Sequence, residues 1–60
     1  MNLTLTPNIE DPDGFYEMLT EAQRDMSAEE ADDMNARLVL ILANQIGQAS
    51  LLREAVELAL

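Results

Sequence analysis

The stretch from Ser27 to Gly47 constrains the fold most, because it carries both a start signal and a stop signal for one helix. Ser27 and Glu30 stand at the spacing of a capping box, in which each side chain satisfies a free backbone N–H at the start of a helix. Gly47 supplies the left-handed residue with which helices commonly end. The sequence therefore predicts a helix over residues 28–46.

This helix is apolar around most of its circumference. At about 100° per residue, only a narrow strip that includes Arg37 and Asn44 is polar. Asn35 and Gln45 lie within the apolar arc, on either side of the uninterrupted apolar block at residues 38–43. A helix that is apolar over so wide an arc must be covered on several sides. We therefore expect part of this surface to form an interface between copies of the chain.

A second helix is predicted over residues 12–25. Asp11 suits the N-cap position, and Pro12 suits the first helical position, where its missing N–H costs nothing. Apolar side chains from Phe15 to Met26 follow at helical spacing. We expect Phe15 to be a core residue.

The rest of the chain predicts a third helix and an arm. After Gly47, apolar side chains recur at helical spacing over residues 49–59. Residues 1–10 alternate leucine with threonine and then reach a proline, which indicates an extended arm or a short edge strand. The expected fold is all-α, with three short helices after the arm, in a single domain over residues 1–60. We expect these domains to pack as a homo-oligomeric helical bundle.

The length of the chain also favours self-association. A chain of 60 residues buries only about 60% of the surface that its unfolded form exposes. Small scaffolds usually add disulfides, a structural metal or oligomerisation. Without cysteine or histidine, this chain can form neither a disulfide nor an ordinary zinc site. We therefore predict a homodimer or a higher oligomer.

Charge is unevenly distributed along the chain. The net charge is −9, and residues 1–34 hold ten of the 12 acidic residues with one arginine, whereas residues 35–60 are neutral. This balance argues against binding to a nucleic-acid backbone or to an anionic membrane. The neutral and apolar C-terminal half is the expected burial surface.

The sequence favours a cytoplasmic location. The first six residues lack the basic region and the longer apolar run of a signal peptide, and the apolar block at residues 38–43 is far too short to span a membrane. We therefore expect a soluble cytoplasmic protein.

The side chains that most enzymes use are missing. The chain has no histidine, cysteine or lysine, which removes the commonest general base, the thiol nucleophile and the Schiff-base amine. Residues 8–13 resemble a fragment of a calcium loop but lack its required order and its closing glutamate. We predict a protein that is not an enzyme and that has no catalytic residues, bound metal or cofactor.

Five polar or amphipathic residues are candidates for an interface or a pocket: Asn35, Arg37, Asn44, Gln45 and Tyr16. In the simpler interpretation, Arg37 forms a solvated or intersubunit ion pair. Asp33 and Glu30 are the nearest carboxylates along the helix. In the same interpretation, Asn35 and Gln45 form hydrogen bonds with a neighbouring backbone segment or with a second copy. The other interpretation places these side chains around a ligand pocket between protomers.

Four motifs run through the chain in a fixed order and spacing. They are Leu3-x-Leu5-x-Pro7-Asn8, Asp11-x-Asp13-x-Phe15-Tyr16, Asn35-Ala36-Arg37-Leu38-x-Leu40-x-Leu42-Ala43-Asn44-x-Ile46-Gly47 and Leu52-x-x-Ala55. In this combination the chain resembles a family of very short bacterial proteins known as domain of unknown function 2783. It departs from the family pattern at Gln45 and Gln48, where a histidine and an aspartate are expected.

The resemblance implies a stand-alone helical protein with no assigned activity. It also suggests an accessory role beside an enzyme encoded nearby, such as a flavin-dependent oxidoreductase. Together, these observations predict a non-catalytic accessory or protein-interaction subunit that self-associates through the helices at 28–46 and 49–59. The alternatives are a small-ligand-binding or weakly catalytic subunit with a pocket between protomers, and an acidic mimic of nucleic acid.

Overall fold

The structure is a computed structural model of the chain, and it describes residues 3–60. Within that range it contains three α-helices and no strand: α1 (Pro12–Ala22), α2 (Ala28–Ile46) and α3 (Ala49–Ala59). Residues 3–10 form neither helix nor strand, and residues 1–2 of the predicted arm lie outside the described residues. The prediction of an all-α fold with three helices is confirmed.

Each of the first two helices begins with a side-chain cap. Asp11 accepts a hydrogen bond from the backbone N–H of Gly14, with 3.1 Å between the two atoms. Ser27 Oγ accepts from the N–H of Glu30 at 3.1 Å, and the Glu30 carboxylate accepts from the N–H of Ser27 at 3.0 Å. These bonds satisfy backbone donors that have no partner within the helix. They explain why α1 and α2 start where their sequences indicate.

The junction between α2 and α3 depends on a glycine. Gly47 has φ 77°, and its N–H donates to the carbonyl of Ala43 at 2.9 Å. A residue with a Cβ is strained in this left-handed conformation, whereas glycine adopts it freely. Gln48 occupies the N-cap position of α3 without a side-chain cap bond. Gly47 therefore ends α2, and the next helix starts two residues later with a weaker cap.

The predicted helix 12–25 is wrong at its C-terminal end, because α1 ends at Ala22. The N–H of Gln23 is shared between the carbonyls of Leu19 and Thr20, at 3.2 Å from each. Bonding to the residue three positions back tightens the last turn. The chain then reverses direction toward α2 over the following residues, which carry no glycine or proline to signal the change.

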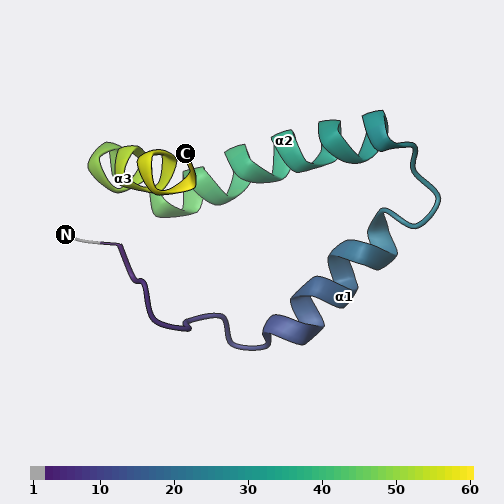
Figure 1. The fold of residues 1–60 in the computed structure, drawn as a ribbon, viewed down its shortest axis with the longest axis horizontal. Coiled ribbons are helices and arrows are strands. Elements are labelled where there is room, and N and C mark those ends of the chain that lie inside the picture. The colour runs from purple at the N-terminus through teal and green to yellow at the C-terminus, as the bar shows by residue number, and fades with distance from the viewer. Residues whose placement is uncertain (1–2) are drawn as a thin grey trace.

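The helices form an open V. Figure 1 shows α1 and α2 diverging from the turn that joins them, with α3 crossing the far end of α2. No Cα atom of α1 lies within 8 Å of a Cα atom of α2, whereas α2 and α3 approach more closely. The arm curves back from α1, so that Leu3 and Leu5 line a shallow cavity with residues of α3.

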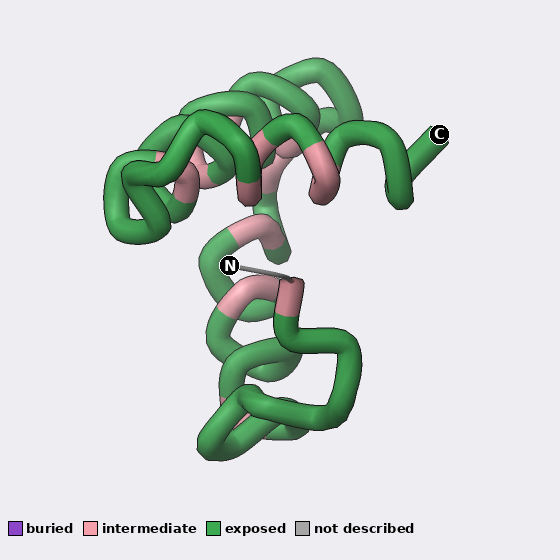
Figure 2. The backbone as a smooth tube through the Cα atoms, turned by 90° about the vertical axis from the view of Figure 1, so that its left-hand side faces the viewer, coloured by how far each residue is buried: buried purple, intermediate pink, exposed green. Residues whose placement is uncertain are grey.

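No residue in the described range 3–60 is buried, as Figure 2 shows. The radius of gyration is 13.3 Å, against about 10.4 Å for a compact domain of this length. The accessible surface is 5505 Å², which exceeds by about 1,600 Å² the roughly 3,900 Å² of a typical folded chain of 6.7 kDa. The prediction of a core position for Phe15 is wrong, because its side chain is 39% exposed.

Candidate interaction surfaces

The second half of α2 and the C-terminal half of α3 leave several large apolar side chains exposed. These side chains are each at least 48% exposed. We call the surface that they form the α2–α3 surface, and it comprises Val39, Leu40, Ile41, Leu42, Ile46, Val56 and Leu58. Soluble monomers rarely leave so many large apolar side chains together in water. The cover that the sequence requires for α2 is therefore absent from the single chain.

Charge does not oppose contact between two copies of the α2–α3 surface. Residues 35–60 contain Arg37 and Arg53 against Glu54 and Glu57, so this half of the chain is neutral. Two neutral surfaces meet without the repulsion that like charges impose.

Glu54 is a polar feature of α3 that the sequence prediction missed. Its Oε2 atom is buried and has no hydrogen-bond partner in the described chain. The residue lines the cavity beside the arm, of about 550 Å³, together with Leu3, Leu5, Glu57 and Leu58. Glu54 follows Leu51 by three positions and precedes Leu58 by four. This spacing places Glu54 on the apolar stripe of α3, and it could have identified the residue from the sequence.

Asn35 finds its partner within the same chain. Gln23 Nε2 donates to Asn35 Oδ1 at 2.7 Å and also lies 3.7 Å from the sulfur of Met34. The turn after α1 thus brings an amide side chain to α2, a partner for Asn35 that the sequence did not predict. A backbone or second-copy partner for the rest of the Asn35 amide stays a prediction. Gln23 itself was missed, although it follows Leu19 by four positions on the apolar stripe of α1.

The other candidate polar residues do not converge. Arg37, Asn44, Gln45 and Tyr16 are exposed, and cavities of about 550, 420 and 180 Å³ in the described range are lined by other side chains. Across residues 3–60 the ion pair joins Arg24 to Glu21, so Arg37 has no carboxylate within 4.0 Å in that range. These cavities are therefore not built from the candidate residues, and a pocket between protomers stays a prediction.

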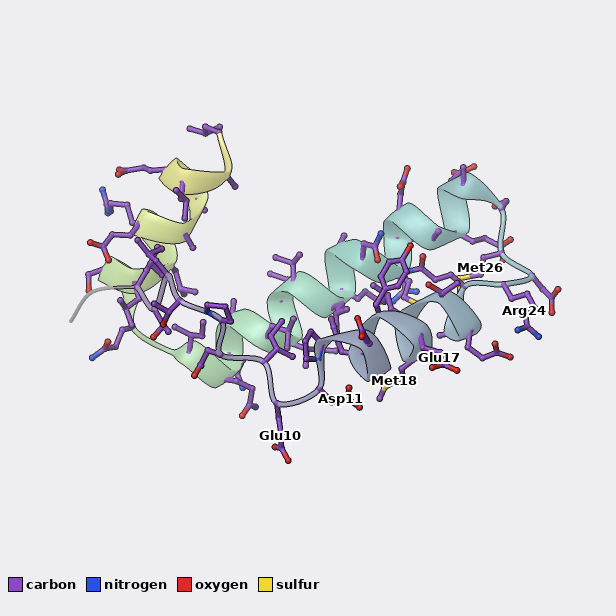
Figure 3. All side chains as sticks on the ribbon, turned by 60° about the horizontal axis from the view of Figure 1, so that its bottom comes forward. Glu10, Asp11, Glu17, Met18, Arg24 and Met26 are labelled. Atoms are coloured by element: carbon purple, nitrogen blue, oxygen red, sulfur yellow. The ribbon has the colours of Figure 1, made fainter. Side chains whose placement is uncertain are left out.

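A second apolar feature lies between α1 and α2. A groove of about 180 Å³ is lined almost entirely by apolar atoms. We call it the methionine groove, and its lining residues are Phe15, Met18, Leu19, Ala22, Met34 and Leu38. Figure 3 shows Met18 on α1, and Met26 at the turn where α1 and α2 meet.

At the start of α2 the surroundings of Glu30 shift the pKa of its carboxyl. The backbone N–H of Ser27 and then its hydroxyl hydrogen-bond to Glu30 and lower the pKa of that carboxyl below its ordinary value of 4.5. The bonds favour the charged form because a carboxylate accepts them more strongly than a carboxylic acid does. Within residues 3–60, no three acidic side chains gather closely enough to hold a metal ion, and no helix has the length and apolarity needed to cross a membrane.

These features define a small acidic all-α protein with exposed apolar surfaces. A family model described as "Protein of unknown function (DUF2783)" matches residues 3–60, and the chain belongs to this family. The match confirms the resemblance carried by the four sequence motifs. Neither the curated proteins nor the solved structures contain a match to the chain.

Proposed function

We propose that this protein is a non-catalytic accessory or protein-interaction subunit that self-associates through its α2–α3 surface. The observation that carries the proposal is the absence of any buried side chain within residues 3–60. Helices of 11 residues, such as α1 and α3, are marginal alone in water, because most helical stability in proteins comes from packing. A second copy supplies the missing cover.

The exposed area fits this assembly. Each chain exposes about 1,600 Å² more than a compact monomer of its mass. Permanent homodimers bury about 1,000 to 2,500 Å² on each partner and use more apolar surfaces than transient complexes do. Burial on that scale, with the α2–α3 surface at the centre of the interface, brings the chain close to the exposure of an ordinary folded protein. In this proposal the protein acts in the cytoplasm beside an enzyme encoded nearby, such as a flavin-dependent oxidoreductase, as the family resemblance suggests.

Light scattering coupled to size-exclusion chromatography tests the self-association. At micromolar concentration we expect the mass of a dimer or a larger assembly. Val56→Asp places a charge on the α2–α3 surface and should shift the mass to that of the monomer. Tyr16→Asp is the matched control, because Tyr16 is 69% exposed and Val56 is 61% exposed, but Tyr16 lies on α1. A wild-type protein that elutes as a stable monomer contradicts the proposal.

A further inference from the structure

The methionine groove has a volume suited to one or two inserted side chains of a binding partner. Its volume of about 180 Å³ is below the roughly 300 to 1,000 Å³ of small-molecule sites. Its walls come from two helices whose backbones stay more than 8 Å apart. Met18 in the wall is 68% exposed. The groove is therefore open to a segment of chain that inserts one or two apolar side chains.

The groove itself is apolar, but the two helices that form it are strongly acidic. From Pro12 to Ile46, the segment that forms both walls, there are eight acidic residues and two arginines, a net charge of −6. The eight carboxylates are all exposed. One of the two arginines, Arg24, is already paired with Glu21. Any occupant of the groove therefore lies in a negative field.

We propose that the methionine groove binds a basic amphipathic helix of another protein. Such a helix inserts apolar residues spaced three and four apart into a groove and keeps its cationic side chains toward the rim. Charge complementarity with the exposed carboxylates of α1, α2 and the turn between them steers the encounter and fixes the orientation. The unbranched side chains of Met18 and Met34 adapt to different apolar partners, which is the usual role of methionine on such surfaces.

The chain's own helices do not meet this description. α1 and α2 each carry a net charge of −3, and α3 carries −1. A second copy would bring a negatively charged helix against two negatively charged helices. The groove and the α2–α3 surface therefore take different partners, one basic and foreign, the other a second copy.

Fluorescence anisotropy of a labelled synthetic peptide tests the groove. The probe is a helix of about four turns with leucines spaced three and four apart and lysines elsewhere, titrated with the full chain. A peptide with glutamate in place of lysine is the charge control. We expect the lysine peptide to bind at least about tenfold more tightly, and to weaken as salt rises from about 0.1 to 1 M, because the Debye length falls from about 10 to 3 Å.

Two variants locate the binding site. Met18→Ser removes a groove side chain and should weaken binding of the lysine peptide about three- to tenfold, by loss of apolar burial. Tyr16→Ser is the matched control, since Tyr16 is similarly exposed on the same helix but does not line the groove, and it should bind as the wild type does. Equal binding of both peptides, or equal loss in the two variants, overturns the proposal.

Light scattering with the peptide present separates the groove from self-association. We expect the mass of the self-associated protein plus bound peptide. Dissociation to monomers on peptide addition would show that a second copy occupies the groove, and it would overturn the proposal. Val56→Asp should abolish self-association and leave peptide binding within about twofold of wild type. Failure at one surface is therefore distinguishable from failure at the other.

Discussion

The two halves of the molecule expose similar apolar side chains in different electrostatic surroundings. Met18 on α1 is 68% exposed and Val56 on α3 is 61% exposed. Residues 1–34 carry the whole net charge of −9, whereas residues 35–60 carry none. Because repulsion opposes contact between two acidic surfaces but not between two neutral ones, similar apolar exposure favours different partners. In the functions proposed above, charge more than apolar area therefore decides which kind of partner each surface binds.

The largest expected effect comes from placing a negative charge on the apolar surface of the neutral half. Leu40 on α2 is 71% exposed, so Leu40→Asp leaves the helix of one chain free of clashes. In a dimer it buries a carboxylate on each side, and we expect the dissociation constant to rise at least about 100-fold. Sedimentation equilibrium measures the constant. An unchanged constant would show that the α2–α3 surface is not the interface.

The junction between α2 and α3 sets the shape of the neutral half. Gly47→Val forces a β-branched residue into a left-handed conformation with φ 77° and should cost about 1 to 2 kcal/mol of stability. Thermal unfolding followed by circular dichroism, at one fixed protein concentration, measures the loss. Gly47→Asn at the same position is the control, since asparagine adopts a left-handed conformation more readily than a β-branched residue does. Equal losses in both variants would contradict this account of the junction.

The start of α2 lies in the acidic half and depends on Ser27. Ser27→Ala removes the hydroxyl that accepts from the first turn and should destabilise the protein by about 1 kcal/mol. Ser50, inside the first turn of α3, makes no such cap, so Ser50→Ala is the matched control with a smaller effect. Chemical unfolding at fixed concentration distinguishes them, and a Ser50 effect as large as that of Ser27 would argue against the capping box.

The smallest effect is a dependence on pH. The pKa of Glu30 is lowered in the folded protein by the Ser27 backbone N–H and then by its hydroxyl. A depressed pKa contributes stability that is present above the ordinary value of 4.5 and lost as the pH falls through the folded-state pKa. Glu30→Gln does not titrate, so the stability difference between wild type and variant should shrink on acidification. A stability difference that stays constant as the pH falls from neutral to well below 4.5 would contradict this assignment.

The sequence predicts features that depend on neighbouring residues. The caps at Asp11 and Ser27 and the stop at Gly47 act within four residues, and the start of α1 and both ends of α2 follow from them. The end of α1 at Ala22 was not predicted, because no glycine or proline signals it. Local chemistry therefore accounts for the helix ends that carry such signals.

Contacts between distant residues were harder to predict. A helical wheel shows which side of α1 is apolar but not whether another element covers it, which is why Phe15 was wrongly expected in a core. The hydrogen bond from Gln23 to Asn35 joins residues 12 positions apart. It depends on the orientation of α1 relative to α2, which the turn between them sets. Asn35 is the candidate polar residue for which the structure shows a side-chain partner, Gln23. Gln23 lies outside α2, so a helical wheel of α2 could not reveal it.

The concentration dependence of helicity tests the central claim most directly, namely that this chain depends on a second copy for its core. Circular dichroism should be recorded over a dilution series, with thermal unfolding at each concentration. We predict that the midpoint of unfolding falls with dilution and that helicity is lost below the dissociation constant, because only association covers the α2–α3 surface. A cooperative transition whose midpoint stays constant across the series, in a protein that remains monomeric, would contradict the account.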